Sequence, residues 1–423
     1  MSDGLFTTLP SRWGTARLDR VATVHARIGW KALTAAEYQS AGYAFLATPN
    51  IKAPKIDFEN VNYISKFRFD ESPDLKLRND DVLLAKDGNT LGIVNIVSEL
   101  QREATVNGSI AVLRAFGIDP RFLRFAIASS VIQKHIGSVK DGMGVPHLFQ
   151  RDIKRFQLPV PPLDEQHRIA DFLDAETSRI DLLAAAQRRL VAILKEREAA
   201  AVEHHLSEVS PHQVRLKNLL TVPPSYGANE SAEHDRRDWP RYIRTTDIAD
   251  DGSLRDSTFA SLPPHTARNY MLNDGDLLFV RSGATVGKSF VYESRFGPAA
   301  HAGYLIRAQV DTSLIDSRLI WHFCQTQNYW QQVSEGTTQA TIQNVNAEKY
   351  GNLLLPMISR DQQRPTLARL DRTVTKSRAL RHRAGRLLDL LTERRQALIT
   401  AAVTGQFDVS TASGRNVTDG VSV

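Results

Sequence analysis

The chain has very little cysteine, since Cys324 is the only one among its 423 residues. A single thiol excludes an internal disulfide framework and a thiolate metal cluster. The residues before it, 319–323 (LIWHF), predict a buried position in a helix. Histidine does not replace cysteine as a metal ligand, because the neighbours His204 and His205 point in different directions on a helix. We therefore expect no metal site.

Long apolar runs are missing as well. No stretch of about 18 apolar residues, the length of a membrane-spanning helix, occurs in the sequence. Residues 1–14 lack the basic region followed by an apolar run that marks an export signal. These absences predict no membrane association and a location in the reducing cytoplasm, which the single cysteine also favours.

No sign of charge dominates, because 53 Lys and Arg stand against 47 Asp and Glu, for a formal net charge of +6. Overall basicity of this size is weak support for nucleic-acid binding. The distribution is more informative, since segments 1–163, 164–208, 209–358 and 359–409 carry about +5, −4, −1 and +6. An acidic second segment and a basic fourth segment are suited to lie against each other.

What the sequence does contain is an internal repeat with a period of roughly two hundred residues. Segment 81–92 matches 276–287, and Leu158-Pro159 matches Leu355-Pro356. Residues 164–201 then match 361–398 at one constant offset. The repeat predicts two related halves, each consisting of one globular segment followed by one long helix of equal length.

Apolar residues recur in alternating steps of three and four through both long segments, which is the coiled-coil pattern. A helix of about 43 residues spans roughly 65 Å and needs a partner to cover its apolar face. A helical hairpin inside one compact domain and an antiparallel coiled coil between two domains are both possible, and equal lengths favour the second. The predicted seam comprises Ile169, Leu173, Ile180, Leu183, Leu190, Leu194, Leu370, Leu380, Leu387, Leu391 and Leu398.

Each globular half has a mixed α/β pattern. Short apolar runs rich in β-branched residues, such as 82–84 and 277–280, alternate with Gly, Asp and Asn turns, and residues 120–136 and 317–333 have helical spacing. The predicted fold class is α/β (α+β), with two mixed domains separated by two long helices in an antiparallel coiled coil and an internal pseudo-two-fold repeat. The predicted segments are 1–163 and 209–358 (domains), 164–208 and 359–409 (helical spacers) and 410–423 (a flexible tail).

Two motifs imitate catalytic signatures. Residues 283–289 (GATVGKS) resemble a phosphate-binding loop, but they have three residues between the glycines where a nucleotide loop needs four, and a strand is predicted to follow. Residues 223–226 (PPSY) resemble a methyltransferase motif, but Val222 replaces the Asn that would hold the target amine. No carboxylate cluster has the form of a nuclease metal site. We therefore predict no catalytic residues.

Three further motifs, taken together, give a resemblance to a known protein family over nearly the whole chain. Residues 158–174 (LPVPPLDEQHRIADFLD) resemble the conserved region of the specificity subunit of type I restriction-modification enzymes. Residues 394–408 (RRQALITAAVTGQFD) are similar to the closing signature of that family, and 276–288 resemble the strand-turn-strand of its target-recognition domains. The second spacer departs from the family pattern at 360–365 (RDQQRP), where Pro365 lies in the predicted first turn.

The resemblance implies a DNA-reading subunit without catalytic activity of its own. In that family each target-recognition domain reads one half of a bipartite DNA site, and the paired helices dock two methyltransferase subunits. Motor-nuclease subunits join through that complex. The implied partners are therefore double-stranded DNA and these subunits, and S-adenosylmethionine, ATP and Mg²⁺ are expected only in the partners. Because the halves differ outside the repeat framework, an asymmetric site is expected.

Reading bases requires side chains with paired donors and acceptors, and cations for nearby phosphates. The alternative is that these polar, glycine-containing loops are only turns. A coiled-coil adaptor that does not read DNA, and an ATP-binding enzyme that uses Lys288, are the competing functions. The candidate DNA-binding residues are Lys86, Asn89, Thr90, Met143, His147 and Gln150 in the first half, and Arg241, Arg244, Arg281, Ser282, Thr285, Lys288, Thr337, Thr338, Gln339, Gln343 and Asn344 in the second.

Overall fold

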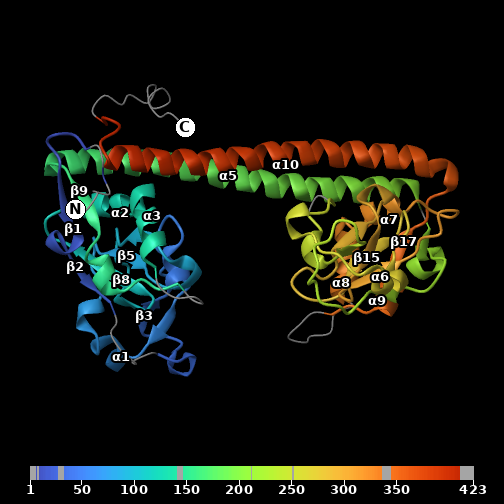
Figure 1. The fold of residues 1–423 in the computed structure, drawn as a ribbon, viewed down its shortest axis with the longest axis horizontal. Coiled ribbons are helices and arrows are strands. Elements are labelled where there is room, and N and C mark those ends of the chain that lie inside the picture. Colours follow the sequence, from blue (N-terminus) through green and yellow to red (C-terminus); the bar gives the residue numbers. More distant parts are fainter. Residues whose placement is uncertain are drawn as a thin grey trace. The chain divides into compact units, whose positions relative to one another are not determined.

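The computed structural model describes residues 6, 9–26, 33–140, 146–210, 212–249, 252–335 and 344–409. The chain divides into two compact units, one of Met1–Gln187 with Leu387–Val423 and one of Arg188–Arg386. Each unit contains one mixed α/β domain and a part of both long helices, α5 (Leu163–Val209) and α10 (Arg360–Val403) (Figure 1). The predicted fold class is thereby confirmed. The five-segment division stays a prediction, and its tail at 410–423 lies outside the described residues.

The first unit is built on a four-stranded antiparallel sheet of order β2-β8-β5-β6. A three-stranded sheet of order β4-β3-β7, with β3 and β7 parallel, and an antiparallel pair β1-β9 complete its strands. The strands are β1 (Gly14–Arg17), β2 (Ala22–His25), β3 (Tyr43–Leu46), β4 (Asn62–Ile64), β5 (Val82–Ala85), β6 (Val94–Ile96), β7 (Ala104–Val106), β8 (Ile110–Ala115) and β9 (Gln157–Val160). The helices of the domain are α1 (Lys66–Asp70), α2 (Pro120–Ala128), α3 (Ser130–Val139) and α4 (Gln150–Ile153).

The second unit repeats this plan. Its four-stranded antiparallel sheet has the order β11-β16-β13-β14, and the pairs β12-β15 (parallel) and β10-β17 (antiparallel) flank it. The strands are β10 (Gln213–Arg215), β11 (Ser225–Tyr226), β12 (Arg241–Ile243), β13 (Leu277–Val280), β14 (Ser289–Val291), β15 (Ala299–His301), β16 (Leu305–Ala308) and β17 (Leu354–Pro356). The helices are α6 (Pro264–Ala267), α7 (Ser317–Phe323), α8 (Gln327–Glu335) and α9 (Ala347–Gly351).

Each segment with helical spacing forms two helices where the sequence suggests one. Ser129 lies between α2 and α3 with an extended backbone (ψ 150°), and its hydroxyl donates to the carbonyl of Ala126 at 2.7 Å. Thr326 lies between α7 and α8 and donates to the carbonyl of Phe323 at 2.7 Å. A hydroxyl that bonds the preceding turn competes with continuation of the helix, and it can cap the next one. The break is therefore part of the repeat.

A buried ion pair ties the central strands of each sheet. Asp81 is 2% exposed and accepts from Arg114 Nε at 2.9 Å. Its counterpart Asp276 is 3% exposed and accepts from Arg307 Nε at 2.7 Å. Burial raises the pKa of both carboxyls above the ordinary value, and the hydrogen bonds from their partners oppose that shift. Asp81 directly precedes β5 and Asp276 directly precedes β13, and these two strands lead to the predicted DNA-reading turns.

In the first unit, part of the predicted helix seam forms the domain core. Ile169, Leu173 and Ile180 of α5 are buried in one cluster with Leu391 and Leu398 of α10 and with residues of the α/β domain. Asp181 of α5 also accepts an ion-pair contact from Arg395 of α10 at 3.3 Å. The two helices therefore pack against each other and against the domain at the same time.

In the second unit the helix pair is antiparallel, because residues further along α5 contact earlier residues of α10. Glu198 pairs with Arg381 at 2.7 Å, and Glu208 pairs with Arg369 at 3.5 Å. Leu370 is fully buried in the core of this unit. Leu194 is half-buried, and its carbonyl accepts from the Ser377 hydroxyl at 3.3 Å.

Four of the predicted seam leucines are not buried. Leu183, Leu190, Leu380 and Leu387 are 49%, 43%, 41% and 41% exposed. A pair of helices covers only a narrow stripe of each, and side chains at the edge of that stripe remain accessible unless a domain covers them. These four leucines do not belong to a domain core, and their place in the helix-pair seam stays a prediction. Helix α10 also continues through Pro365, which lies inside it.

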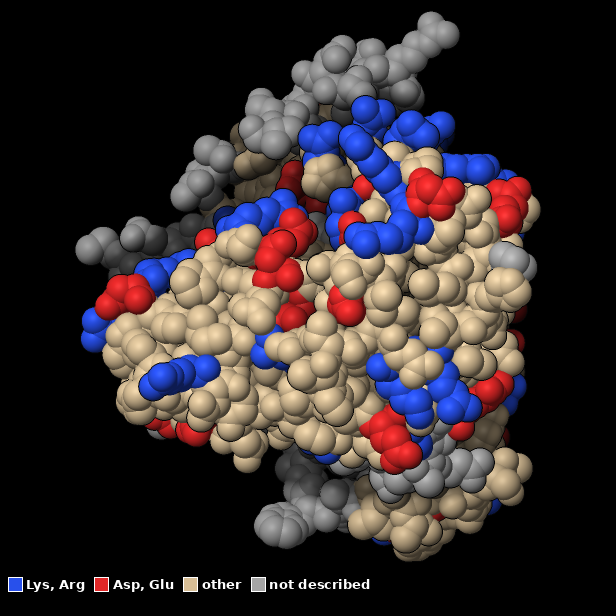
Figure 2. Space-filling model, turned by 90° about the vertical axis from the view of Figure 1, so that its right-hand side faces the viewer, with Lys and Arg blue, Asp and Glu red and all other residues tan. Residues whose placement is uncertain are grey.

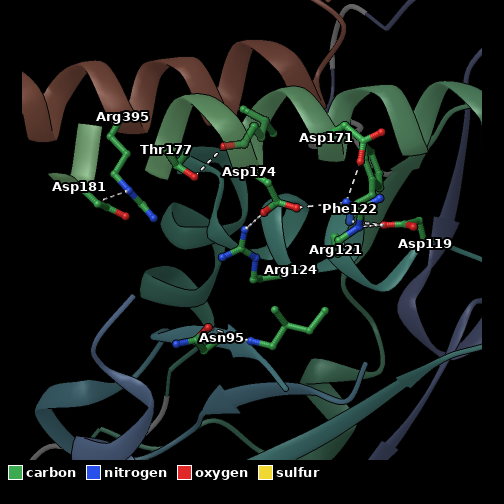
Figure 3. A network of polar contacts seen from close by, with 12 residues as sticks. Asn95, Asp119, Arg121, Phe122, Arg124, Asp171, Asp174, Thr177, Asp181 and Arg395 are labelled. Carbon is green, nitrogen blue, oxygen red and sulfur yellow. Dashed lines mark hydrogen bonds and ion pairs between the residues drawn. The ribbon is translucent and has the colours of Figure 1, made fainter. Parts of the chain in front are cut away.

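A polar network fixes α2 to α5 in the first unit (Figure 3). Asp174 of α5 accepts from Arg124 at 2.8 Å, and Asp171 accepts from Arg121 at 2.7 Å. Figure 1 shows α2 between α5 and the sheet, so these contacts join the helix to the domain. In the second unit Arg318 and His322 of α7 contact Asp371 of α10 in the corresponding way.

Candidate nucleic-acid interface

In the first unit the two predicted DNA-reading segments lie side by side. The turn after β5 runs from Lys86 to Gly92, and the backbone N–H of Leu148 donates to the Lys86 carbonyl at 2.9 Å. The N–H of Gly88 donates to the carbonyl of Pro146 at 2.8 Å. Segments 58 to 62 residues apart in sequence thus form one surface at the end of the sheet.

Some side chains of this surface form ion pairs and hydrogen bonds with one another. Lys86 is 7% exposed, and its ammonium lies 3.1 Å from Asp87 Oδ2. His147 Nδ1 contacts the other oxygen of Asp87. Burial raises the pKa of Asp87, whereas the hydrogen bonds from His147 and Lys86 lower it. The lowering effects together are larger, so the pKa of Asp87 lies below its ordinary value. The triad presents an ionised carboxylate between two nitrogen groups.

The remaining first-half candidates differ in availability. Asn89 is exposed at the tip of the turn. Thr90 donates to the Asp87 carbonyl at 3.2 Å, and Gln150 donates to the carbonyl of Val24 at 2.5 Å, so both stabilise the loops that carry them. Met143 lies outside the described residues.

Sequence reasoning missed an aromatic and cationic pair beside His147. Phe149 is 38% exposed, and the Arg151 guanidinium lies 4.6 Å from its ring centre. The His147 ring meets the Phe149 ring edge-on, with centroids 4.5 Å apart. Stacked arginine and exposed aromatic rings are typical of nucleic-acid surfaces. The alternation of aromatic and basic residues in 147–151 (HLFQR) was the available signal.

The second unit has the same backbone arrangement with different side chains. The N–H of Val345 donates to the Arg281 carbonyl at 2.8 Å, as Leu148 does to Lys86. Ser282 and Asn344 form an antiparallel bridge, as Asp87 and His147 do in the first unit. Thr337, Thr338, Gln339 and Gln343 of the same predicted loop lie outside the described residues.

Two exposed tyrosines adjoin this second surface. The Arg281 guanidinium lies 4.7 Å from the ring centre of Tyr226, which is 44% exposed. The Tyr226 hydroxyl accepts from the N–H of Ala347 at 3.3 Å. Tyr304 is 64% exposed, and its carbonyl accepts from the N–H of Arg281 at 3.0 Å. Neither tyrosine was predicted, because no sequence pattern indicates that residues so distant meet at Arg281.

The other second-half candidates separate into exposed and internally bonded groups. Thr285 and Asn344 are exposed, and Ser282 is half-buried. Lys288 donates to the carbonyl of Ile248 at 2.9 Å, which joins the turn to a neighbouring loop. Strand β14 begins at the next residue, so the predicted strand after this glycine turn is confirmed and the turn lacks the helix of a nucleotide loop.

Arg241 and Arg244 bond the interior of their own domain. Arg241 is 8% exposed and donates to the carbonyl of Arg255 at 2.6 Å, and burial lowers its pKa. Arg244 Nη2 donates to Asp247 Oδ1 at 3.1 Å, and Asp247 is fully buried. These guanidiniums stabilise the loop at 255–258, and their predicted phosphate contacts stay predictions.

The described residues contain no group of three or more His, Cys, Asp or Glu that could hold a metal ion. Cys324 is a buried free thiol at the end of α7, as the sequence indicates, and burial raises its pKa. None of the described helices is long and apolar enough to cross a membrane.

Residues 10–190 match the family described as type I restriction modification DNA specificity domain. This match and the curated relatives below agree with the resemblance to the specificity subunits of type I restriction-modification systems found in the sequence.

Among curated relatives, the StySPI specificity subunit of Salmonella potsdam is 23% identical over 332 residues, which cover 74% of this chain and 71% of the relative. The EcoKI specificity subunit of Escherichia coli K12 is 24% identical over 289 residues, 64% of this chain and 62% of the relative. A solved chain from work on assembly and conformational transition of the type I R-M system is 19% identical, with a TM-score of 0.63, and covers 95% of this chain and 100% of that one. The similarity to this solved chain, at 19% identity, shows a shared fold alone.

Proposed function

We propose that this specificity subunit reads a bipartite, asymmetric DNA sequence, with each α/β domain reading one half. The observation that carries the proposal is the paired surface in each unit. In both, a turn residue (Lys86 or Arg281) accepts a backbone hydrogen bond from the second loop, and different side chains project from the same frame. A common backbone with different donors and acceptors suits two different half-sites.

The second part of the proposal concerns partners. The long helices dock two methyltransferase subunits, and motor-nuclease subunits join through them. The exposed leucines of α5 and α10, such as Leu182 at 73% and Leu390 at 59%, support this part, because apolar side chains on a soluble helix favour a protein partner. StySPI and EcoKI are named as specificity subunits of restriction enzymes, which agrees with such an assembly.

Catalysis belongs to the partners in this proposal. The subunit itself supplies recognition and positioning, and S-adenosylmethionine, ATP and Mg²⁺ bind to the methyltransferase and motor-nuclease subunits. Its place of action is the cytoplasm, where the DNA is.

The test is co-expression with the methyltransferase subunit of the same system, followed by mapping of methylated adenines. We expect one split motif with two unrelated halves. Uniform modification, or none in a complex that assembles, would contradict DNA reading and favour a structural adaptor. A symmetric motif would contradict only the assignment of different half-sites.

A further inference from the structure

The helix α10 carries a row of cations along one exposed face within the second unit. Residues 360–386 contain nine Lys and Arg against two Asp. Five of these cations follow steps of three, four, seven and three, so they share one face of the helix. They are all exposed, and they comprise Arg369, Arg372, Lys376, Arg383 and Arg386. By the rise of an α-helix the row is about 26 Å long.

The row lies away from the core of its own unit. The buried face of this part of α10 consists of Leu367, Leu370 and Val374, and two residues in a helix are about 200° apart, so Arg369, Arg372 and Lys376 project on nearly the opposite side. Figure 2 shows Lys and Arg gathered along the upper edge of this unit, where the helix pair lies in Figure 1.

Carboxylates within the described residues do not neutralise the row. Arg369 alone has an ion-pair partner, Glu208 of α5, at 3.5 Å, and both are largely exposed. Glu198 pairs with Arg381 on another face, and Glu203 accepts from the backbone N–H of Gln327. Cations held so close together repel one another, and an anionic partner removes that cost.

The repeat shows that this row is particular to one helix. At the offset that relates Gln166 to Gln363, the five positions correspond to Phe172, Ala175, Arg179, Ala186 and Arg189 of α5. Phe172 packs against Phe407 at 5.5 Å between ring centres, and Arg179 pairs with Glu176 at 2.8 Å. The two repeats therefore differ at matched positions, because α5 has three apolar residues and two arginines where α10 has five cations.

We propose that the row on α10 binds an acidic helix of a methyltransferase subunit, and that the two methyltransferase copies consequently bind with unequal sensitivity to salt. This rests on the proposed docking of two such subunits. Identical partners cannot be equally complementary to a face with five cations and to one with two. The copy on α10 depends more strongly on charge than the copy on α5 does.

The spacing favours a helix over DNA as the occupant. A partner helix with the same heptad repeat presents carboxylates in steps that match the cations. Leu380, 41% exposed, adjoins the row and supplies an apolar contact that a helix uses and phosphates do not.

The experiment is a titration of the intact chain with its methyltransferase subunit at NaCl concentrations from about 50 to about 500 mM, a range over which exposed charges become screened. The variant Arg372→Glu with Lys376→Glu reverses two cations that make no hydrogen bond or ion pair with the described residues. The matched control is Lys52→Glu with Lys55→Glu, the same change of charge at two exposed residues of the first unit. Native mass spectrometry counts the bound copies.

We expect the unchanged chain to bind two copies at low salt and to lose one of them as salt rises. The Arg372→Glu, Lys376→Glu variant binds the second copy about tenfold more weakly or not at all, and the control binds both. Loss of both copies at the same salt concentration, or two copies on the reversed variant as on the control, overturns the inference. Reduced affinity for nonspecific duplex DNA with both copies retained also overturns it, because the row would then be a DNA surface. Absence of any bound copy at all salt concentrations refutes the proposed docking itself.

Discussion

Gln166 of α5 accepts a hydrogen bond from the backbone N–H of Asp119 at 2.7 Å, directly before α2. Its own amide donates to the carbonyl of Pro161 at 2.8 Å. One side chain that is 2% exposed thus joins the end of β9, the start of α5 and the start of α2. Gln363 has the corresponding contact with the N–H of Asp316 at 3.1 Å, but it is only half-buried.

The first prediction follows from that difference in burial. Gln166→Leu leaves a buried donor and a buried acceptor unsatisfied, which costs about 2 kcal/mol or more in the free energy of unfolding of the first unit. Gln363→Leu costs about 1 kcal/mol or less, because water reaches its partners. Hydrogen exchange of the peptides at 112–130 and 309–327 in graded urea measures each unit separately. Equal losses in the two variants would contradict the argument.

The second prediction concerns Arg281. Arg281→Ala removes both the charge and the stack on Tyr226, and the modified sequence relaxes at one or more bases of one half-site, with a loss of about 1–3 kcal/mol of discrimination. Arg281→Lys keeps the charge but not the planar stack, so binding persists while discrimination falls. Mapping of methylated adenines in co-expressing cells measures both. Asn89→Ala serves as the comparison, since it alters only the other half-site. Changes in both half-sites from either variant would disprove independent reading.

The third prediction uses two glycines of the same turn that both have positive φ. Gly287 has φ +86°, and an added Cβ would lie 2.7 Å from Trp330 Cζ3. Gly283 has φ +90°, and nothing lies within 4 Å of its Cβ position. Gly283→Ala therefore costs about 1–2 kcal/mol for conformation alone. Gly287→Ala costs that and about 1–3 kcal/mol more for the displaced ring. Urea unfolding monitored by tryptophan fluorescence measures the loss of unfolding free energy in each variant. A larger loss for Gly283→Ala than for Gly287→Ala would contradict the prediction.

The fourth prediction concerns acid stability of the second unit. Burial of His301 lowers its pKa to about 4 from the ordinary value of 6.5. Between these two values the unfolded chain binds the proton and the folded chain does not, so stability is lost as pH falls below 6.5. The loss attributable to His301 is about 2 kcal/mol at pH 5.

Replacing His301 with Asn removes this proton linkage. The free energy of unfolding should then change less between pH 7 and pH 5, whatever its absolute value at pH 7. Some dependence remains, because burial also lowers the pKa of His322. An unchanged difference between the two pH values would show that His301 does not titrate as stated.

The sequence predicted the parts of the fold that depend on local periodicity. Strands β5 and β13, the long helices and the repeat itself follow from apolar spacing. Burial along the helices could not be predicted, because Leu173 and Leu183 have the same heptad pattern and only the first is covered by a domain. The helix break at Ser129 was also not predicted, because a serine inside a helical pattern does not show whether its hydroxyl will cap a new helix.

The candidate surface was predicted as two loops in each half, and in both units the described part of the second loop, at 146–148 and 344–345, contacts the turn of the first. Which side chains remain accessible depends on partners distant in sequence. Arg244 is committed to Asp247 and Thr258, and Tyr226 approaches Arg281 only through the strand order of the sheet. A single sequence contains no pattern from which these contacts could be predicted.

The joint between turn and loop is made by main-chain atoms, from Leu148 to Lys86 and from Val345 to Arg281. Amide and carbonyl groups are common to nearly every residue, so this joint tolerates exchange of the side chains around it. New base preferences can therefore arise by point substitution at the tips without rebuilding the scaffold, and the two halves of the chain are free to diverge in specificity while their frames stay alike.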